Sequence, residues 1–364
     1  MLPGSRYFKG VKMGLFGKNK GVIGVDIGSS SIKIVELKET KKGYLLANYG
    51  IAHIPSEVIV DGAIMDSSAV VEAIKNLIAE KKIKTRDAAI SVSGHSVIIK
   101  KITLPAMTEA ELEESINWEA EQYIPFPISD VNMDFHILEM VAGQSQMDVL
   151  IVAVKKDMIN DYTAVMAEAG LNPVVVDVDS FALENAYCIN YDILPDETVA
   201  LVNMGAHVTN INILKGGTST LTRDVSVGGR QITNEIQKNV GVGFDDAEIL
   251  KCGGEVSGVD SKDIDGIVKL GANAIVTEVQ RSLDFYLSTS HEGKIDRVYL
   301  SGGSSKIKGI AATVTERTGI PTELIDPFLK IGFNQKTFNS VILKKDAPLL
   351  CVGVGLAIRK PGDK

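Results

Sequence analysis

The sequence has few cysteines, no long hydrophobic run and no excess of positive charge. Cys188, Cys252 and Cys351 lie far apart, without a CxxC pair or a nearby histidine, which argues against a zinc site or a disulfide framework. We interpret them as reduced thiols of a cytoplasmic protein. No stretch approaches the roughly 20 apolar residues that a membrane-spanning helix needs. The net charge of −8 argues against nucleic acid as the main ligand.

The N-terminal residues 1–20 lack the apolar segment of a signal peptide. We expect residues 1–20 to form an N-terminal extension, whose first 12 residues lie upstream of Met13, a plausible natural start. The 364 residues, 45% of them hydrophobic, predict a globular protein of two or more domains.

An internal repeat is the first informative pattern. The segment "VDIGSSSIKIVEL" (25–37) aligns without gaps with "VNMGAHVTNINIL" (202–214). Each reads as a strand, a polar residue, a glycine turn and a second alternating strand, which is the pattern of a β-hairpin. Two hairpins of one design predict two similar lobes that face each other.

The first hairpin has the chemistry of a phosphate site. Small turn residues let backbone N–H groups approach an anion, and the hydroxyls of Ser29, Ser30 and Ser31 add donors. Lys33 can supply a point charge, and Asp26 can hold a hydrated Mg²⁺. The alternative is ordinary hairpin chemistry, because Gly-Ser turns beside an aspartate are common.

Two further glycine turns precede predicted helices. One is Gly302-Gly303-Ser304, which follows the short strand "RVYL", and the other is Gly228-Gly229. A glycine turn between a strand and a helix favours an anion or nucleoside site. Neither turn matches the P-loop or the Rossmann pattern.

Together these motifs resemble the actin, sugar-kinase and chaperone ATPase superfamily. Within it the chain is similar to FtsA and, more closely, to the type IV pilus assembly PilM family. The resemblance runs from Met13 to Arg359 and rests on "GVDIGSSSIKIVEL", "WEAEQYIPFPISDVNMDFHIL", "FALENAY", "SVGGRQITNEI", "LDFYLS", "LSGGSSKIKGI" and "CVGVGLAIR". It implies an α/β fold: an actin-like two-lobe ATPase with duplicated β-hairpin phosphate loops and an FtsA-type α+β insert.

The resemblance also implies a domain order. The first lobe (1A) is expected at 21–94 and 173–196, and the insert (1C) at 95–172. The second lobe (2A) is expected at 197–226 and 297–364, with its subdomain 2B at 227–296. Within the insert, Thr108 and Glu111 predict a helix that begins with a capping box.

By the same resemblance the cofactors are ATP and Mg²⁺, and Asp26 holds the metal through water. Gly302, Gly303 and Ser304 would lie against the adenosine, with Glu248 and Lys251 near the ribose and base. An exposed surface pair is the alternative for Glu248 and Lys251. The full expected cofactor site is Asp26, Gly28, Ser29, Ser30, Ser31, Lys33, Asn203, Gly205, Ala206, Gly228, Gly229, Glu248, Lys251, Gly302, Gly303 and Ser304.

Two positions depart from the pattern of hydrolysing relatives. Asn203 stands where a second aspartate is usual, and Phe181 stands near the place of a water-positioning glutamine, with Glu184 one turn away. We therefore expect ATP binding with slow or absent hydrolysis, and name no catalytic residue. His207 lies in the second turn, where it could contact a phosphate, although a lone histidine in a turn is more often incidental. His53, His95, His136 and His291 show no metal-ligand spacing.

The resemblance implies a partner as well: the short cytoplasmic N-terminal segment of the membrane protein PilN, held in a groove between the first lobe and the insert. Other platform and motor components of the pilus, a homo-oligomer and a place at the inner membrane of a bacterium are compatible with it. Trp118 lies off the apolar face of its helix, and is either covered by the neighbouring sheet or a partner contact. The alternatives are an FtsA-like division filament, which would need a basic amphipathic helix after Arg359, and a small-molecule kinase.

Overall fold

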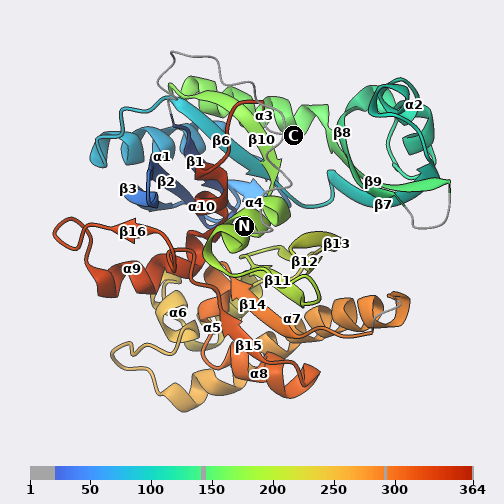
Figure 1. Ribbon diagram of the computed structural model, residues 1–364. Coiled ribbons are helices and arrows are strands. Elements are labelled where there is room, and N and C mark those ends of the chain that lie inside the picture. Colours follow the sequence, from blue (N-terminus) through green and yellow to red (C-terminus); the bar gives the residue numbers. More distant parts are fainter. Residues whose placement is uncertain (1–20, 141–144, 291–292, 363–364) are drawn as a thin grey trace.

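The structure, a computed structural model, describes residues 21–140, 145–290 and 293–362. The expected extension at 1–20 and His291 lie outside these residues. The chain forms two lobes, each built around a mixed sheet, and a smaller insert that projects from the first lobe (Figure 1). No helix of the described ranges is both long and apolar enough to cross a membrane.

The first lobe is a six-stranded sheet with helices on both faces. From edge to edge its strands are β10 (Asn172–Val178), β6 (Asp87–Val92), β1 (Ile23–Ile27), β2 (Ser31–Thr40), β3 (Gly43–His53) and β16 (Gly332–Phe333). Central β1 is buried along its whole length, as a strand covered on both faces must be. The segment that follows β3 forms a separate short hairpin of two strands, β4 (Ile59–Val60) and β5 (Ala63–Ile64).

Two pairs of helices cover this sheet. One pair is α1 (Ser67–Glu80) and α3 (Lys156–Glu168), and the other is α4 (Asp179–Asn190) and α10 (Cys351–Ala357). Helix α1 begins at Asp66, whose side chain accepts from the Ala69 amide at 3.0 Å. Helix α10 lies directly on β1 because Gly24 has no side chain: a Cβ there would stand 2.1 Å from the Gly353 carbonyl oxygen.

The second lobe repeats the hairpin-based sheet. Its strands, in order, are β13 (Thr218–Val225), β12 (Thr209–Lys215), β11 (Thr198–Met204), β14 (Arg297–Ser301) and β15 (Thr322–Leu324). The helical part consists of α5 (Arg230–Val240), α6 (Phe244–Lys251), α7 (Ser261–Thr289), η2 (Gly303–Lys306) and α8 (Ile310–Thr318). Near the C-terminus follow α9 (Ser340–Asp346) and η3 (Ala347–Leu349).

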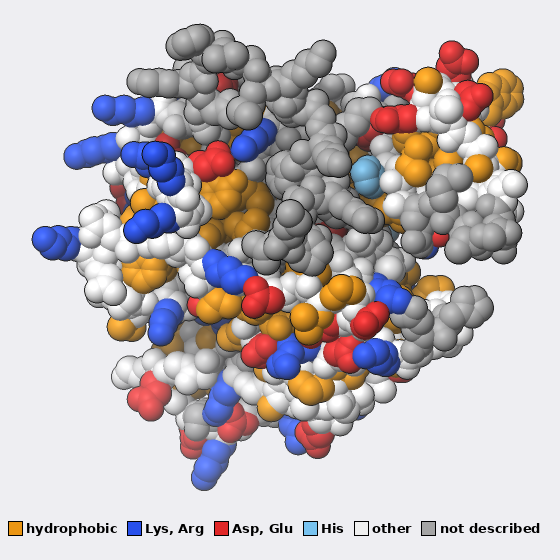
Figure 2. Space-filling model, viewed as in Figure 1, with side chains coloured by type: hydrophobic (Ala, Val, Ile, Leu, Met, Phe, Trp, Pro, Cys, Tyr) orange, Lys and Arg blue, Asp and Glu red, His pale blue; other side chains and the backbone are white. Residues whose placement is uncertain are grey.

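The insert has its own sheet and core. Its strands are β7 (Val97–Pro105), β9 (Gln146–Lys155) and β8 (Val131–Met140), and its helices are α2 (Glu109–Glu121) and η1 (Ile128–Asp130). The capping box predicted at Thr108 and Glu111 is present. Trp118 is 79% exposed, so the interpretation that the neighbouring sheet covers it is wrong. Acidic and hydrophobic side chains lie side by side on the surface of the insert (Figure 2).

The observed boundaries differ from the expected ones at two places. Helix α3 lies within the expected insert 95–172, but it packs in the core of the first lobe. Strand β10 begins at Asn172, the last residue of the expected insert, and pairs with β6 of the first lobe. The part with its own sheet therefore ends at Lys155. The C-terminal segment, expected in the second lobe, returns to the first, because β16 pairs with β3 and α10 packs on β1. Local patterns did not reveal these long-range contacts.

Candidate functional site

The first hairpin places charged side chains opposite each other. Asp26 on β1 pairs in register with Lys33 on β2, and their side chains form an ion pair at 3.2 Å. The turn between them closes with a hydrogen bond from the Gly28 amide to the Ser31 carbonyl at 3.2 Å. Burial raises the pKa of the Asp26 carboxyl, and the charge of Lys33 opposes this. The hairpin thus holds a buried, charged pair beside a turn of small residues.

The second hairpin has the same geometry with neutral side chains. Asn203 on β11 pairs in register with Asn210 on β12, and the Asn203 amide donates to Asn210 Oδ1 at 2.9 Å. Its turn closes with a bond from the Gly205 amide to the Val208 carbonyl at 2.9 Å. The predicted gapless alignment of the two hairpins is confirmed, because the paired positions correspond residue by residue.

A chain of hydrogen bonds continues from this pair to the first lobe. Asn210 donates to Asp224 Oδ1 at 2.8 Å, and Asp224 Oδ2 accepts from the Gly94 amide at 2.7 Å. Burial raises the pKa of Asp224, and these two hydrogen bonds oppose the rise. Gly94 has a positive φ of 93° and directly precedes the insert. Asp224 therefore links the second hairpin to Gly94, shortly before β7 begins the insert.

The other glycine turns meet the second hairpin closely. The Gly229 amide lies 3.1 Å from both the Gly205 carbonyl and the Ser304 hydroxyl. A side chain at Gly228 would collide with the Ala206 carbonyl oxygen at 2.5 Å. Gly302, with φ of 82°, leaves room for Asn203. These glycines let separate turns come together around one space.

Glu248 and Lys251 belong to this assembly. Lys251 is buried, and its Nζ lies 2.6 Å from Glu248 Oε1 and 2.9 Å from the Thr233 hydroxyl. Thr233 also donates to Glu248. The alternative of an exposed surface pair is therefore wrong for Lys251.

The turns enclose a cleft of about 420 Å³ between the two lobes. All of the predicted cofactor residues line it except Gly228 and Gly229, which pack behind its wall. The cleft thus gathers residues that lie more than 270 positions apart in the sequence, from Asp26 to Ser304. Hydroxyls, backbone turns and both signs of charge face the same space, which suits a polyphosphate ligand.

Sequence reasoning missed several residues of the cleft wall. Asp179 lies at the start of α4, accepts from the Ser91 hydroxyl at 2.6 Å, and its charge contributes to the raised pKa of Asp26. Arg230 and Phe244 begin α5 and α6, with the Arg230 guanidinium 4.7 Å from the Phe244 ring centre. For Asp179 the available signal was an acid directly after a buried strand. For Arg230 it was a cation directly after Gly-Gly.

Phe181 and Glu184 do not line the cleft. Phe181 packs against the core of the first lobe. Glu184 points to the second-lobe sheet, where it accepts from the Asn212 amide at 3.2 Å, and burial raises its pKa to about 8. Neither side chain is placed to orient a water molecule in the cleft.

The histidines form no metal site in the described residues, where no group of three His, Cys, Asp or Glu side chains converges. His207 does line the cleft, and its Nδ1 is buried without a hydrogen-bond partner. Burial and the charge of Arg230 lower its pKa. His207 is therefore part of the cleft wall, with a ring nitrogen that no described side chain or backbone group engages.

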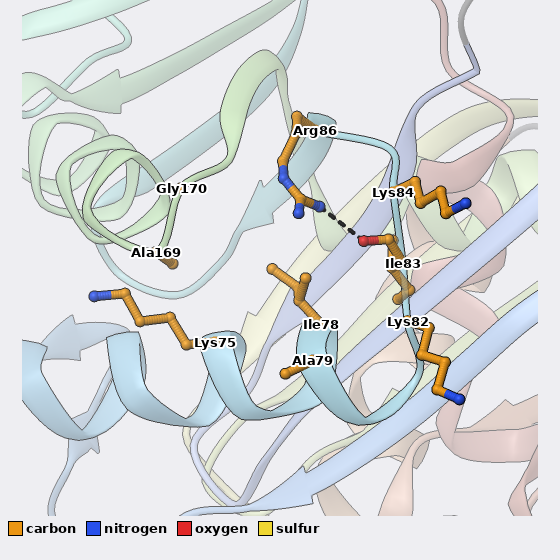
Figure 3. A pocket seen from close by; sticks show the side chains of 9 residues that line it. All are labelled: Lys75, Ile78, Ala79, Lys82, Ile83, Lys84, Arg86, Ala169 and Gly170. Atoms are coloured by element: carbon orange, nitrogen blue, oxygen red, sulfur yellow. Dashed lines mark hydrogen bonds between the residues drawn. The ribbon is translucent and has the colours of Figure 1, made fainter.

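A second hollow, of about 490 Å³, lies on the first lobe between α1, the segment before β6 and the end of α3 (Figure 3). Ile78, Ile83 and Ala169 form its apolar floor. Its basic side chains are those of Lys75, Lys82, Lys84 and Arg86. Arg86 is held by a hydrogen bond to the Ile83 carbonyl at 2.8 Å (Figure 3). None of the predicted site residues lies there, so the cleft between the lobes is the stronger candidate.

Comparisons with solved structures give the same fold. A chain of the PilM–PilN type IV pilus biogenesis complex superimposes with a TM-score of 0.83 and 28% sequence identity, covering 94% of this chain and 98% of that chain. The ethanolamine utilization protein EutJ of Carboxydothermus hydrogenoformans follows with a TM-score of 0.56 and 17% identity, covering 93% of this chain and 89% of its own. The predicted actin-like α/β fold is confirmed.

Comparisons of the sequence identify the family to which the chain belongs. The cell division protein FtsA of Bacillus subtilis (strain 168) is 23% identical over 260 residues, which cover 64% of this chain but only 58% of FtsA. The sequence profile of the type IV pilus assembly protein PilM matches residues 24–361, which is nearly all of the described chain. The chain therefore belongs to the type IV pilus assembly protein PilM family.

Proposed function

We propose that this protein is an ATP-binding scaffold of type IV pilus assembly. The observation that carries the proposal is the single cleft in which the charged hairpin, the neutral hairpin and the Gly302–Ser304 turn meet. Such a cleft can hold phosphates on backbone amides and hydroxyls while a nucleoside lies on the glycine turn. ATP would then bridge the two lobes and fix their relative position.

Magnesium would enter with the nucleotide. Mg²⁺ in nucleotide sites usually keeps several waters and uses one or two carboxylates together with phosphate oxygens. Asp26 fits this use, because its carboxylate lines the cleft close to the charge of Asp179. The ion would neutralise phosphate charge, and Asp26 would hold it through water.

Hydrolysis is proposed to be slow or absent. Turnover requires an oriented water and stabilisation of developing charge. Asn203 offers a neutral amide that already donates to Asn210, and Glu184 is engaged by Asn212 away from the cleft. Binding without rapid turnover suits a scaffold better than a motor.

The proposed partner is the N-terminal cytoplasmic segment of a PilN-like membrane protein, in a groove between the first lobe and the insert. The likeness to a chain of the PilM–PilN complex over nearly the whole length supports this. We propose that this contact keeps the protein at the cytoplasmic face of the inner membrane, near other pilus components and in contact with further copies of itself. These observations do not favour a division filament or a small-molecule kinase.

A matched pair of glycine variants tests the nucleotide site. A Cβ at Gly303 or at Gly266 would meet no atom within 4 Å, so both Gly303→Val and Gly266→Val should fold. Only Gly303 lines the cleft. We expect Gly303→Val to weaken ATP binding at least about tenfold in calorimetric titration, while Gly266→Val retains it. ATP binding that survives in Gly303→Val would place the nucleotide elsewhere.

The partner can be tested with the only tryptophan of the chain as a probe. Trp118 is largely exposed, so covering it would shift its fluorescence emission to shorter wavelength. A synthetic PilN N-terminal peptide is titrated by calorimetry and fluorescence, with a scrambled peptide as control. Failure of the peptide to bind would overturn the proposed partner, and binding without an emission shift would place the groove away from Trp118.

A further inference from the structure

Arg230 is a buried cation that forms no ion pair with any described residue. It is the first residue of α5 and is only 6% exposed. Within the described part of the chain, its Nη2 is buried and meets no hydrogen-bond acceptor. Its guanidinium lies over the ring of Phe244, which supplies an apolar surface and a weak attraction. Burial lowers the pKa of Arg230, as expected for a cation removed from water.

The charge of Glu248 acts on Arg230, but Glu248 already has other partners. Glu248 favours the charged form of Arg230, but its Oε1 is already bound by Lys251 at 2.6 Å and by Thr233. The cation of the first hairpin, Lys33, likewise has its own carboxylate in Asp26. Arg230 therefore differs from the partly buried Lys33 and the buried Lys251, because each of these two lysines has a paired acid.

A second unsatisfied nitrogen lies in the same wall. His207 Nδ1 is buried without a partner, and His207 senses the charge of Arg230. Both residues line the cleft, one from the second hairpin turn and one from the start of α5. Neutral histidine can donate from Nδ1 in the corresponding tautomer, so the wall offers two unused donors to an acceptor in the cleft.

We propose that Arg230 and His207 form an anion subsite that accepts a phosphate group of the bound nucleotide. This inference rests on the proposed ATP-binding function. It adds the residues of the second lobe that would recognise the negative charge of the nucleotide. A buried charge is costly unless it is paired, and the guanidinium fork matches two phosphate oxygens. With neutral Asn203 in the adjacent hairpin, Arg230 is the buried charged group of this wall that is free to engage the ligand.

The test compares a phosphorylated ligand with one that has no phosphate. ATP and adenosine are titrated calorimetrically against wild type, Arg230→Met and Arg230→Lys. Arg230→Met should weaken ATP binding at least about tenfold, the usual order for a hydrogen bond to a charged group, and leave adenosine within about twofold. Arg230→Lys keeps the positive charge but lacks the forked guanidinium, so its affinity for ATP should lie between those of wild type and Arg230→Met.

Folding is checked in the same proteins. Replacing an unpaired buried cation by a similar apolar side chain should not lower the melting temperature without nucleotide, whereas a purely structural arginine would leave a less stable protein. Arg281→Met is the control, because Arg281 lies exposed on α7 and pairs with Glu278. It should bind ATP as wild type does.

Each other result overturns the inference. Equal weakening of ATP and adenosine would mean that Arg230 shapes the cleft and does not contact phosphate. Unchanged ATP binding in Arg230→Met would remove the subsite while the proposed function stands. Failure of wild type itself to bind ATP would overturn the proposed function and this inference together, and the wild-type titration alone identifies that case.

Discussion

The two hairpins that face each other across the cleft share a backbone but differ in chemistry. In the first, the paired positions hold Asp26 and Lys33, and in the second they hold Asn203 and Asn210. Each turn closes with the same type of glycine amide bond. Under the proposed function, the shared backbone would position the phosphates of a nucleotide, while the side chains at two register positions decide how much charge each lobe brings to the cleft.

Under the proposed function, this difference would allow nucleotide binding without rapid hydrolysis. A carboxylate and an ammonium group can hold a metal and a phosphate, and two amides can only donate and accept neutral hydrogen bonds. An asymmetric cleft of this kind can hold a nucleotide from one side while the other side contributes little to the activation of water. The following predictions test that asymmetry.

The largest expected effect comes from truncating each hairpin at its first paired position. Lys33 is nearly buried, and Asp26→Ala removes the carboxylate with which it forms an ion pair. The substitution should therefore lower the free energy of unfolding by about 3 kcal/mol. Asn203→Ala removes a neutral hydrogen bond and should cost about 1 kcal/mol. Urea denaturation measures both. The double variant Asp26→Ala/Lys33→Met should recover much of the stability that Asp26→Ala loses. If Asp26→Ala and Asn203→Ala lower the free energy of unfolding equally, the proposed difference between the two hairpins is wrong.

A smaller effect is expected from giving the second hairpin a charge. Asn203→Asp restores a carboxylate facing the cleft, and we expect single-turnover hydrolysis of Mg²⁺–ATP to rise about tenfold, or about 1.4 kcal/mol in the barrier. Enzyme in excess over ATP, with ATP affinity measured in parallel, separates turnover from binding. An unchanged rate at full occupancy would show that the neutral residue at position 203 does not limit hydrolysis.

The smallest effect concerns Glu184, which contacts β12 of the second lobe from α4 of the first. Because burial raises its pKa from 4.5 to about 8, the folded state binds the proton more tightly than the unfolded chain. Its contribution to stability is complete below pH 4.5 and is lost as pH rises through 8. Between pH 7 and pH 8 we expect a loss of about 1 kcal/mol.

Glu184→Gln keeps a neutral side chain at that position and should remove this part of the pH dependence. Urea denaturation at each pH compares the variant with wild type. A pH dependence of the same slope in both proteins would mean that Glu184 is not the group that titrates.

The hairpins themselves were predictable because their signal is local. Period-two alternation and a glycine turn specify each of them, and the repeat specifies their common design, including the correspondence of Asp26 with Asn203. The capping box of α2 was predictable for the same reason. These features depend on neighbours within a few residues, and the sequence contains all of that information.

What was missed depends on contacts between distant segments. Nothing near Arg230 indicates that it is buried against Phe244, and nothing near Glu184 indicates that it meets Asn212. The return of α10 to β1 depends on Gly24 and Gly353, more than 300 residues apart in sequence. The exposure of Trp118 was not predictable for the same reason. The sequence pattern places Trp118 off the apolar face of its helix, but it does not show whether another element covers the side chain.

The hydrogen bond from Gly94 to Asp224 has a mechanical consequence. It joins the second lobe to the residue that directly precedes the insert, and Asp224 in turn is held by the amide pair at the cleft. Separation of the lobes must therefore either break this bond or pull on the base of the insert. The coupling acts in both directions. A molecule that binds the insert and favours one position of the insert relative to the second lobe would therefore change how tightly the cleft closes. It would do so without contacting a ligand in the cleft.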